Sequence, residues 1–595
     1  MSDRTLLIRG GTVVDGSGGA PFVADVLVCG GKIVEVSSSV ALAVDEEIDA
    51  RGLLVTPGFV DIHTHYDGQA TWEQSLRPSA LHGVTTVVTG NCGVGFAPCH
   101  PGDRDDLVRL MEGIEDIPEV VMTAGLPWAW QTFPEYLEFL DKRAYDIDVA
   151  TQIPHAPLRV YVMGKRGMAR EPATLEDMEK MRDLVREAVD AGALGFSTSR
   201  SINHKTRDGE HTPSFEAAER ELHVIASGLT DAGKGVLQVI TDFPLVSEVP
   251  GRIEFLVDLS KRSGRPLSFT LAQFHGAPHS WQQALELTEQ GRANGVDIKG
   301  QVFPRPMGMV MSLETTRNPF TESPAYSALL SQTLEVRVAA MKTSSVRQSI
   351  IEQARSAPLQ AKQRDFDFVF PLRNAMDYEP SLADSVSALA TKLGVAPDEL
   401  AYDLLLEEGG RGVLWAGFAN IIDGSLEPVL RMLRSDATVV GLGDGGAHYG
   451  LICDASYPTF MLSYWGRDRT RGERLPLANI VKSLARDTAE AVGLYDRGLI
   501  KPGCKADINV IDFDALQLSL PSVVYDLPGG GKRLVQSATG YRATVVSGQV
   551  TYRDGKPTGA MPGKLVRGAR SGIPQELSAA VVDERCVGSE KKYKH

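Results

Sequence analysis

Two histidines separated by one residue, His63 and His65, end an apolar run in the segment PGFVDIHTHYD. If this run is a β-strand, residues two positions apart point to the same side, so both imidazoles would face one point at the strand's carboxyl end. Neutral imidazole nitrogens are good ligands for zinc and similar divalent cations. The spacing therefore predicts two ligands of a metal site.

A carboxylate that could complete this chemistry is Asp444, which follows the apolar run TVVGLG and precedes two glycines that leave it uncovered. A carboxylate beside a divalent cation can bind that cation. It can also accept a proton from a water molecule whose pKa the cation lowers toward 7. Asp444 is therefore predicted both as a metal ligand and as the catalytic proton acceptor.

Alternating strands and helices are the elements that would bring these distant segments together. Helical periodicity marks ATLEDMEKMRDLVREAVDAG and AAERELHVIASGLTDAG, and strand–helix alternation repeated about eight times indicates a (β/α)8 barrel. The first and eighth strands of a closed barrel are neighbours, so His63, His65 and Asp444 can meet. The predicted strands are GFVDIHTH, VTTVVTGNC, DVATQIPH, ALGFSTSR, GVLQVITDF, PLSFTLAQFH, VDIKGQVFP and TVVGLGDGG.

Short alternating runs separated by glycines occur at both ends of the chain, as in LLIRGGTVVDG and TGYRATVVSGQVTYRDGKP. They predict strands joined by tight turns. The expected fold class is α/β, a TIM-like (β/α)8 barrel with a small β-sandwich domain built from both chain ends. The expected boundaries are 1–56 plus 497–560 for the small domain, 57–496 for the barrel with an insertion at about 305–435, and 561–595 for a C-terminal tail.

With these segments in view, the chain resembles the amidohydrolase superfamily, close to the N-acyl-D-amino-acid deacylases. The similarity extends from Ile8 to Gly559. It implies a metal-dependent hydrolase with the fold just described. The segments that carry it are IRGGTVVDGSG, TPGFVDIHTHYD, GVTTVVTGNCGVGFAP, EGIEDIP, AGALGFSTSR, GLGDGGAH, LARDTAEAVGLYDRGLIKPGCKADINVID and VVSGQVTYRDGKPTG.

The resemblance also implies a third metal ligand after the second strand. In the deacylase branch the cysteine of the NCG segment binds the metal, and that position is Cys92 here. Cys99 matches no such position and is expected to be structural. The fourth strand, ALGFSTSR, has no lysine of the kind that bridges two metals in hydantoinase-like and urease-like relatives, which agrees with a cysteine-type site.

The chain departs from the resemblance at strands five and six. Typical deacylases carry metal-binding histidines there, whereas Gln238 and Gln273 occupy the corresponding positions here. Amides are poorer zinc ligands than imidazoles. Either one Zn²⁺ binds to His63, His65, Cys92 and Asp444, which the sequence favours, or two metals bind with His275 or Asp242 as a substitute.

Two further residues are candidates for binding substrate. His155 lies just after the third predicted strand, where the resemblance places a similar His-x-x-Leu-Arg run near the pocket. Arg305, in FPRP after the seventh strand, could pair with a substrate carboxylate because guanidinium geometry suits that group. A core histidine and a loop salt bridge are the respective alternatives.

Composition limits the class of partner. The net charge of −15 gives no long-range attraction to phosphate backbones or anionic lipid, so neither nucleic acid nor a membrane is expected as a partner. The sequence leads us to expect neither a secretory signal nor a membrane-spanning run, and the six scattered cysteines do not resemble a disulfide framework. A cytoplasmic protein acting on a small-molecule amide is expected, and it could form homo-oligomers.

The reaction expected from these residues is metal-assisted hydrolysis of a non-peptide C–N amide bond. The resemblance suggests an N-acyl-D-amino acid as substrate. Hydrolysis of a cyclic amide or lactone, as in hydantoinases and imidases, is an alternative that the same metal and aspartate could serve. A barrel scaffold without catalytic activity is the alternative from another class, favoured by the glutamines on strands five and six.

Overall fold

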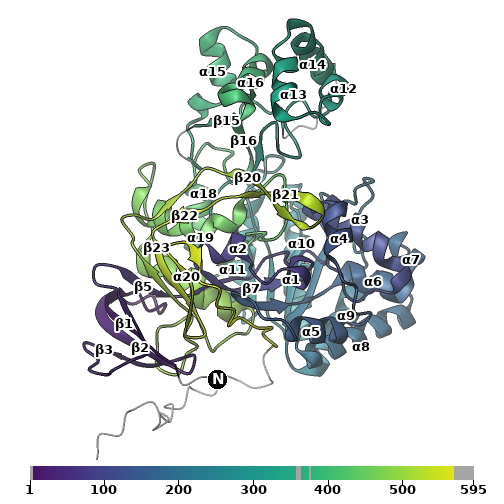
Figure 1. Ribbon diagram of the computed structural model, residues 1–595. Coiled ribbons are helices and arrows are strands. Elements are labelled where there is room, and N and C mark those ends of the chain that lie inside the picture. Colours follow the sequence, from purple (N-terminus) through teal and green to yellow (C-terminus); the bar gives the residue numbers. More distant parts are fainter. Residues whose placement is uncertain (1–3, 357–362, 374–376, 569–595) are drawn as a thin grey trace, which may run out of the picture.

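The structure is a computed structural model that describes residues 4–356, 363–373 and 377–568 (Figure 1). The middle of the chain contributes short parallel strands, separated by helices, to two sheets. One sheet has the order β6-β7-β8 and a second has the order β9-β10-β11-β12-β13-β17. The strands are β6 (Phe59–Asp61), β7 (Val84–Thr89), β8 (Asp148–Thr151), β9 (Ile153–Pro154), β10 (Gly195–Ser199), β11 (Val236–Ile240), β12 (Leu267–Thr270), β13 (Ile298–Val302) and β17 (Thr438–Val440).

Each of the eight predicted runs contains at least one of these strands. Gln152 alone separates β8 from β9, so the third run passes from the first sheet to the second. At the other end of the strand order, a parallel bridge between Thr64 and Gly445 sets the segment after β6 beside the segment after β17. The first and last predicted strands are therefore neighbours at their carboxyl ends.

Helices between the strands arise from amphipathic segments with defined ends. α8 (Leu175–Ala191) begins with a capping box, in which Thr174 and Asp177 bond to each other's backbone N–H groups, and it ends at Gly192. It packs against α9 (Glu219–Ala232), and these two helices confirm the two periodic segments named above. The other helices that follow central strands are α6 (His155–Met163), α10 (Val249–Ser263), α11 (Ser280–Ala293), α18 (Glu427–Leu433) and α20 (Leu477–Ala491).

Strands from both chain ends form one nine-stranded sheet, on the purple and yellow side of Figure 1. β1 pairs antiparallel with β2 but parallel with β4 and β5. The order is β25 (Lys556–Pro557), β24 (Gln549–Arg553), β23 (Tyr541–Val546), β18 (Ile508–Ile511), β5 (Leu54–Pro57), β1 (Thr5–Val13), β2 (Phe22–Cys29) and β3 (Lys32–Ser37), with β4 (Glu46–Asp49) beside β1.

Arg497 joins the central strands to this sheet. Its guanidinium donates to Thr86 of β7 at 2.7 Å and pairs with Asp148 of β8 at 2.8 Å, while Lys505, just before β18, also contacts Asp148 at 3.1 Å. Arg497 and Asp148 are both buried. Because a buried carboxylate is costly without its partner, this ion pair makes the junction sensitive to loss of the arginine.

We expect Arg497→Met to lower the free energy of unfolding by about 3–5 kcal/mol, because it leaves Asp148 buried without its main cation. Arg262→Met removes an exposed ion pair with Asp258 on α10 and should cost less than about 1 kcal/mol. Chemical denaturation of both variants measures the difference. Equal, small losses would show that the Arg497 pair does not stabilise the junction.

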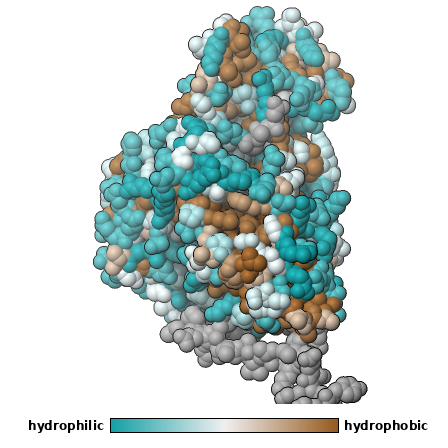
Figure 2. Space-filling model, turned by 90° about the vertical axis from the view of Figure 1, so that its left-hand side faces the viewer, coloured by the Kyte–Doolittle hydropathy of each residue, from teal (hydrophilic) through white to brown (hydrophobic). Residues whose placement is uncertain are grey.

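Between β13 and β17 the chain forms a unit with its own apolar core, at the top of Figure 1. Its antiparallel sheet has the order β14-β16-β15, and helices pack on it. From the side, in Figure 2, this unit stands above the rest of the molecule. It contains β14 (Met307–Met311), α12 (Pro324–Ser327), α13 (Leu334–Met341), α14 (Ser344–Ser356), β15 (Val369–Leu372), α15 (Val386–Leu393), α16 (Pro397–Leu405), α17 (Glu407–Gly410) and β16 (Val413–Ala419).

The described part of the predicted C-terminal tail lies along β8. Gly563 forms a bridge with Tyr145, Leu565 forms one with Val149, and the N–H of Gly568 donates to the carbonyl of Gly192. Residues 569–595 of that predicted tail lie outside the described residues. Among the residues that the structure describes, no helix combines the length and apolar character needed to cross a bilayer.

Candidate metal centre

His63 and His65 follow β6 and lie on the same side of the chain. Thr64 between them is turned the other way, with its hydroxyl and its N–H both bonded to the carbonyl of Val88 on the neighbouring segment. The side chains of His63 and His65 are 1% and 0% exposed. The alternation expected of a strand therefore extends past β6 and directs both rings inward.

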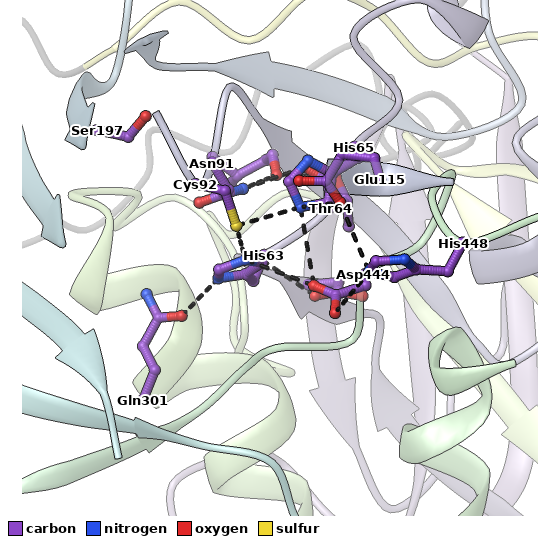
Figure 3. Close-up of polar contacts among 12 residues, drawn as sticks. His63, Thr64, His65, Asn91, Cys92, Glu115, Ser197, Gln301, Asp444 and His448 are labelled. Atoms are coloured by element: carbon purple, nitrogen blue, oxygen red, sulfur yellow. Dashed lines mark hydrogen bonds and ion pairs between the residues drawn. The ribbon is translucent and has the colours of Figure 1, made fainter. Parts of the chain in front are cut away.

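Cys92 completes a compact group with the two histidines (Figure 3). Its Sγ lies 3.3 Å from Nε2 of His63 and 3.6 Å from Nε2 of His65. The side chain of Asn91, just before it, donates to the carbonyls of Thr64 and Val88 and so ties the loop after β7 to the histidine segment. These contacts hold the thiol against both imidazoles.

Asp444 approaches the same point from the segment after β17. Its Oδ1 lies 3.5 Å from Nε2 of His63 and 3.8 Å from Nε2 of His65. Its backbone N–H donates to the carbonyl of His63, and the N–H of His65 donates to the carbonyl of Gly445. The structure thus brings together all four residues that the sequence analysis assigned to the metal.

Ligating atoms of His63, His65 and Cys92 all lie within 4.8 Å of one another and could hold a metal ion. Zinc binds nitrogen at about 2.0–2.1 Å and sulfur at about 2.3 Å, which places neighbouring ligands of a tetrahedral ion about 3.3–3.7 Å apart. Sγ of Cys92 lies 3.3–3.6 Å from the two nitrogens. Oδ1 of Asp444 lies 3.5–3.8 Å from them, which is longer than a direct hydrogen bond between nitrogen and oxygen. An ion could sit between these atoms without moving them far.

Backbone strain marks the same loops. Cys92 has a φ of 56° and Asp444 a φ of 48°, values in the left-handed region that residues other than glycine rarely adopt. His448, four residues after Asp444, has a φ of 52°. Such conformations persist where the surrounding structure imposes them, and they cluster at functional sites.

Burial sets the protonation of the ligands. It lowers the pKa of His63 to about 4, so that this imidazole is neutral near pH 7 and its Nε2 can bind a cation. Burial, together with the charges of Glu115 and Asp444, raises the pKa of the Cys92 thiol. Because the thiolate is the form that binds metal, a cation must displace a proton from Cys92.

This proton release predicts a pH dependence. Between pH 6 and 8 His63 is already neutral and the Cys92 thiol is still protonated, so each cation bound there releases at least one proton. We therefore expect the affinity for Zn²⁺ to rise about tenfold or more per pH unit and to fall as the pH is lowered. Isothermal titration of the metal-free protein at several pH values measures this slope. An affinity independent of pH would contradict it.

Gln301 on β13 orients the first histidine. Nδ1–H of His63 donates to Oε1 of Gln301 at 2.8 Å, and Nε2 of Gln301 in turn donates to Ser268 at 2.8 Å. The second bond fixes which end of the amide faces the ring. Nε2 of His63 is then left with its lone pair directed at Cys92 and Asp444.

We expect Gln301→Leu to weaken metal binding by roughly 10–100-fold, the usual cost of losing an outer partner of a ligating histidine. Gln301→Glu keeps an acceptor for Nδ1–H and should retain most of the affinity. Competition with a chromogenic chelator compares the two variants. If Gln301→Leu binds as tightly as the unaltered protein, the hydrogen bond does not orient the ligand.

Two residues of the site were not predicted as ligands. Glu115, the last residue of α3 (Arg104–Glu115), places Oε2 3.5 Å from Nε2 of His65 and 3.6 Å from Nε2 of His448. Nε2 of His448 lies 3.8 Å from Oδ2 of Asp444. The available signals were the EGIEDIP segment and the histidine four positions after Asp444 in GDGGAH.

The two predicted substrate-binding residues are engaged within the protein. His155 is fully buried, with hydrogen bonds to Glu221 at 2.9 Å and Thr198 at 2.8 Å. Arg305, which is 1% exposed, pairs with Asp454 at 2.7 Å, and its guanidinium lies over the ring of Tyr378. The structure places both in buried polar networks, and their role toward substrate stays a prediction.

Asp242 and His275, the substitutes weighed for a second metal, are not part of the metal-holding group among the described residues. Gln238 on β11 is buried, and neither polar atom of its side chain has a hydrogen-bond partner among the described residues. Gln273 donates to Asp423 at 2.9 Å. Asp242 accepts from Ser201 and from the N–H of Ile202, and the ring of His275 packs edge-on against Phe368.

Comparison with known proteins gives a family match over most of the chain. The model of the Amidohydrolase family matches residues 46–552. An uncharacterized protein of Mycobacterium tuberculosis is 27% identical over 96% of this chain and 97% of its own. The D-aminoacylase of Alcaligenes xylosoxydans xylosoxydans is 35% identical over 32% of this chain and 37% of its own, and an N-acyl-D-aspartate deacylase of the same organism is 38% identical over 33% and 39%.

Solved structures of similar fold cover almost the whole chain. A crystal structure of D-aminoacylase has a TM-score of 0.62 at 22% identity, with 94% of this chain and 99% of the other covered. N-acyl-D-glutamate deacylase from Bordetella bronchiseptica, complexed with zinc and a phosphonate inhibitor, has a TM-score of 0.61 at 20% identity, with 95% and 100% covered. At these identities the likeness concerns the fold.

Proposed function

Because the chain belongs to the amidohydrolase family and is therefore a hydrolase of C–N bonds other than peptide bonds, we propose that it is a metal-dependent deacylase of N-acyl-D-amino acids. The observation that carries the proposal is the group formed by His63, His65 and Cys92, whose ligating atoms all lie within 4.8 Å of one another, with Oδ1 of Asp444 3.5–3.8 Å from both histidine nitrogens. The proposed resident cation is Zn²⁺, which suits this mixture of nitrogen, sulfur and oxygen ligands.

The relatives support the choice of substrate. Three proteins of Alcaligenes xylosoxydans xylosoxydans that share 29–38% identity with parts of this chain are named D-aminoacylase, N-acyl-D-aspartate deacylase and N-acyl-D-glutamate deacylase. Their names share an N-acylated D-amino acid and differ in its side chain. We infer the same general class here, with the amino acid side chain left to experiment.

The fold inferred with this function is a closed (β/α)8 barrel with a small β-sandwich domain from both chain ends. Support comes from the sequential order of the parallel strands and from the Thr64–Gly445 bridge between the segments after β6 and β17. Active sites of such barrels lie at the carboxyl ends of the strands, where His63, Cys92 and Asp444 are found. The domain boundaries expected from the sequence are part of the same proposal.

In the proposed reaction the bound cation and Asp444 have different roles. When bound, a divalent cation would polarise the substrate carbonyl and make a water molecule more acidic. Asp444 is 20% exposed, unlike His63 and His65, so its carboxylate is the group of this set that faces arriving substrate. It accepts the proton of the attacking water at a carboxylate oxygen and returns that proton to the leaving nitrogen, which yields a carboxylate and an amine.

A panel of N-acetyl-D-amino acids, their L-enantiomers and a hydantoin tests the proposal with the Zn²⁺-loaded protein. We expect release of free amino acid from one or more D-substrates at a rate well above that of the matching L-compound. His63→Asn, which lacks one of the proposed metal ligands, is the negative control and should release no amino acid. Turnover of the cyclic amide alone would favour the hydantoinase-like alternative, and turnover of neither class would contradict the proposed reaction.

A further inference from the structure

A cavity of about 410 Å³ lies at the carboxyl ends of β10 and β11, and its size is in the usual range for a small-molecule site. It is lined by Arg200 directly after β10, by Thr241 directly after β11, and by residues of α9 and α10, which pack against each other. None of His63, His65 and Cys92 is among the described residues that line it. The cavity is therefore separate from the metal centre, although both lie at the carboxyl ends of central strands.

Arg200 supplies a cation to this cavity. One N–H of its half-buried side chain donates to the carbonyl of Ala217 at 3.1 Å, and its guanidinium carbon lies 5.2 Å from the centre of the Phe255 ring. No carboxylate forms an ion pair with it in the described part of the chain. Because a guanidinium has five N–H donors in a planar fork, its remaining donors suit the two oxygens of a carboxylate.

The position of this guanidinium is unfavourable for its charge. Burial lowers the pKa of Arg200 from the usual value of an arginine, and the charges of Glu219 and Glu216 act in the opposite direction. The backbone nevertheless fixes the residue there, since the N–H of Arg200 donates to the carbonyl of Ile240 at 2.8 Å. An anion bound to the guanidinium would offset the water that the charge loses on burial.

Two carboxylates of the same cavity, those of Glu216 and Glu219, are available to a ligand as well. Both residues are exposed, and neither forms an ion pair within the residues that the structure describes. Their charges act on Arg200, so they lie near its guanidinium without pairing with it. The other two charged residues of the wall, Arg252 and Glu248, are joined to each other at 2.9 Å and balance one another.

Apolar side chains complete the wall. Phe255 and Leu256 of α10 are buried, and the ring of Phe215 stacks on that of His211 with the ring centres 4.0 Å apart. Ile202, which lines the same cavity, keeps 44% of its surface exposed. One cation, two carboxylates and an apolar wall together match a zwitterion with an apolar side chain. An N-acylated amino acid carries a carboxylate but no ammonium, so the two carboxylates favour the free amino acid over the acylated one.

We propose that this cavity binds a free amino acid with an apolar side chain, with its carboxylate on Arg200 and its ammonium on Glu216 and Glu219. The inference rests on the proposed function, because deacylation at the metal centre would release a free amino acid at the same end of the central strands. The cavity then takes the product class, whereas the metal centre takes the N-acylated substrate. Binding involves no reaction, so it can be measured apart from catalysis.

Calorimetric titration of the Zn²⁺-loaded full-length protein with three related probes tests the charges of the ligand. D-Leucine carries both charges, 4-methylpentanoate lacks the ammonium, and D-leucinol lacks the carboxylate. We expect D-leucine to bind about tenfold or more tightly than either of the others, since each of them lacks one charge-assisted interaction. Equal affinity for D-leucine and 4-methylpentanoate, or no binding of D-leucine at millimolar concentration, would overturn the proposal.

Variants show where D-leucine binds. Arg200→Met, and separately Glu216→Gln combined with Glu219→Gln, should each weaken its binding by about tenfold or more while the zinc content stays the same. The control is Arg252→Met, which alters an arginine of the same wall that is already paired with Glu248 and should change the affinity by less than about threefold. The glutamate variant alters exposed side chains, so it decides the matter if Arg200→Met does not fold.

The outcomes separate this site from the proposed function. Unchanged affinity in both the arginine and the glutamate variants would place D-leucine outside the cavity and overturn the inference. Deacylation by protein that does not bind D-leucine would contradict the cavity site alone. Binding of D-leucine in the cavity by protein that deacylates nothing would contradict the proposed function alone.

Discussion

Asp444→Asn is expected to lower kcat for amide hydrolysis by about a hundred- to ten-thousandfold, the usual contribution of a positioned acid or base. Asparagine has nearly the same shape, and its amide oxygen can still face Nε2 of His63. It cannot accept the proton of an attacking water near neutral pH. The loss should therefore appear in kcat, while His63, His65 and Cys92 keep the bound cation.

The measurement is steady-state deacylation together with metal analysis of the same preparation. Asp436→Asn, an exposed carboxylate shortly before β17, is the matched control and should leave kcat unchanged. If Asp444→Asn retains its cation and keeps kcat within tenfold of the unaltered protein, proton transfer by Asp444 is contradicted. Restored activity at high pH would instead show that solvent hydroxide can replace the missing acceptor.

Cys92→Ser is expected to remove the bound cation and, with it, the hydrolytic activity. Sγ lies 3.3–3.6 Å from both histidine nitrogens, and a serine hydroxyl does not ionise at neutral pH to replace the thiolate. The loss of affinity should exceed the roughly 10–100-fold cost of altering an outer-shell residue. Elemental analysis and the deacylation rate measure the two consequences.

Cys99→Ser provides the comparison for this variant. Cys99 is also a buried free thiol, but its Sγ bonds to the carbonyl of His100 and lies outside the metal group. It should keep both cation and activity, as expected for the structural role predicted from the sequence. A Cys92→Ser protein that binds Zn²⁺ as tightly as Cys99→Ser would show that the thiol is not a ligand.

The sequence is most informative where a single local pattern determines the structure. The run VTTVVT is rich in β-branched residues and lies entirely buried in β7, as expected for a parallel strand covered on both faces. The spacing of His63 and His65 depends only on the alternation of side chains along an extended chain. The position of Asp444 required the further inference that the first and last strands are neighbours.

Glu115 and His448 show where local patterns are insufficient. Glu115 ends a helix with several other acidic residues, and an acid in such a segment is usually solvated. In the structure it is buried beside His65 and beside His448, which lies more than 300 residues away in the sequence. Only the folded structure shows that contact, although the position of His448 four residues after Asp444 was a visible signal.

Arg305 was predicted to bind substrate from its residue type and position, but its partner in the structure belongs to the protein. An arginine near the end of a central strand is chemically suited to a substrate carboxylate, and the sequence analysis proposed that role. The structure instead provides a carboxylate of the protein itself, Asp454, at 2.7 Å. Because this partner follows the strand β17 and not β13, nothing near Arg305 in the sequence indicates the pair.

X-ray absorption spectroscopy of the Zn²⁺-loaded protein tests the metal centre most directly, because it reports the atoms bound to the metal. We predict a sulfur shell at about 2.3 Å together with nitrogen and oxygen ligands at about 2.0–2.1 Å, and loss of the sulfur shell in Cys92→Ser. A fully loaded protein with only nitrogen and oxygen ligands would contradict a cation held by His63, His65 and Cys92.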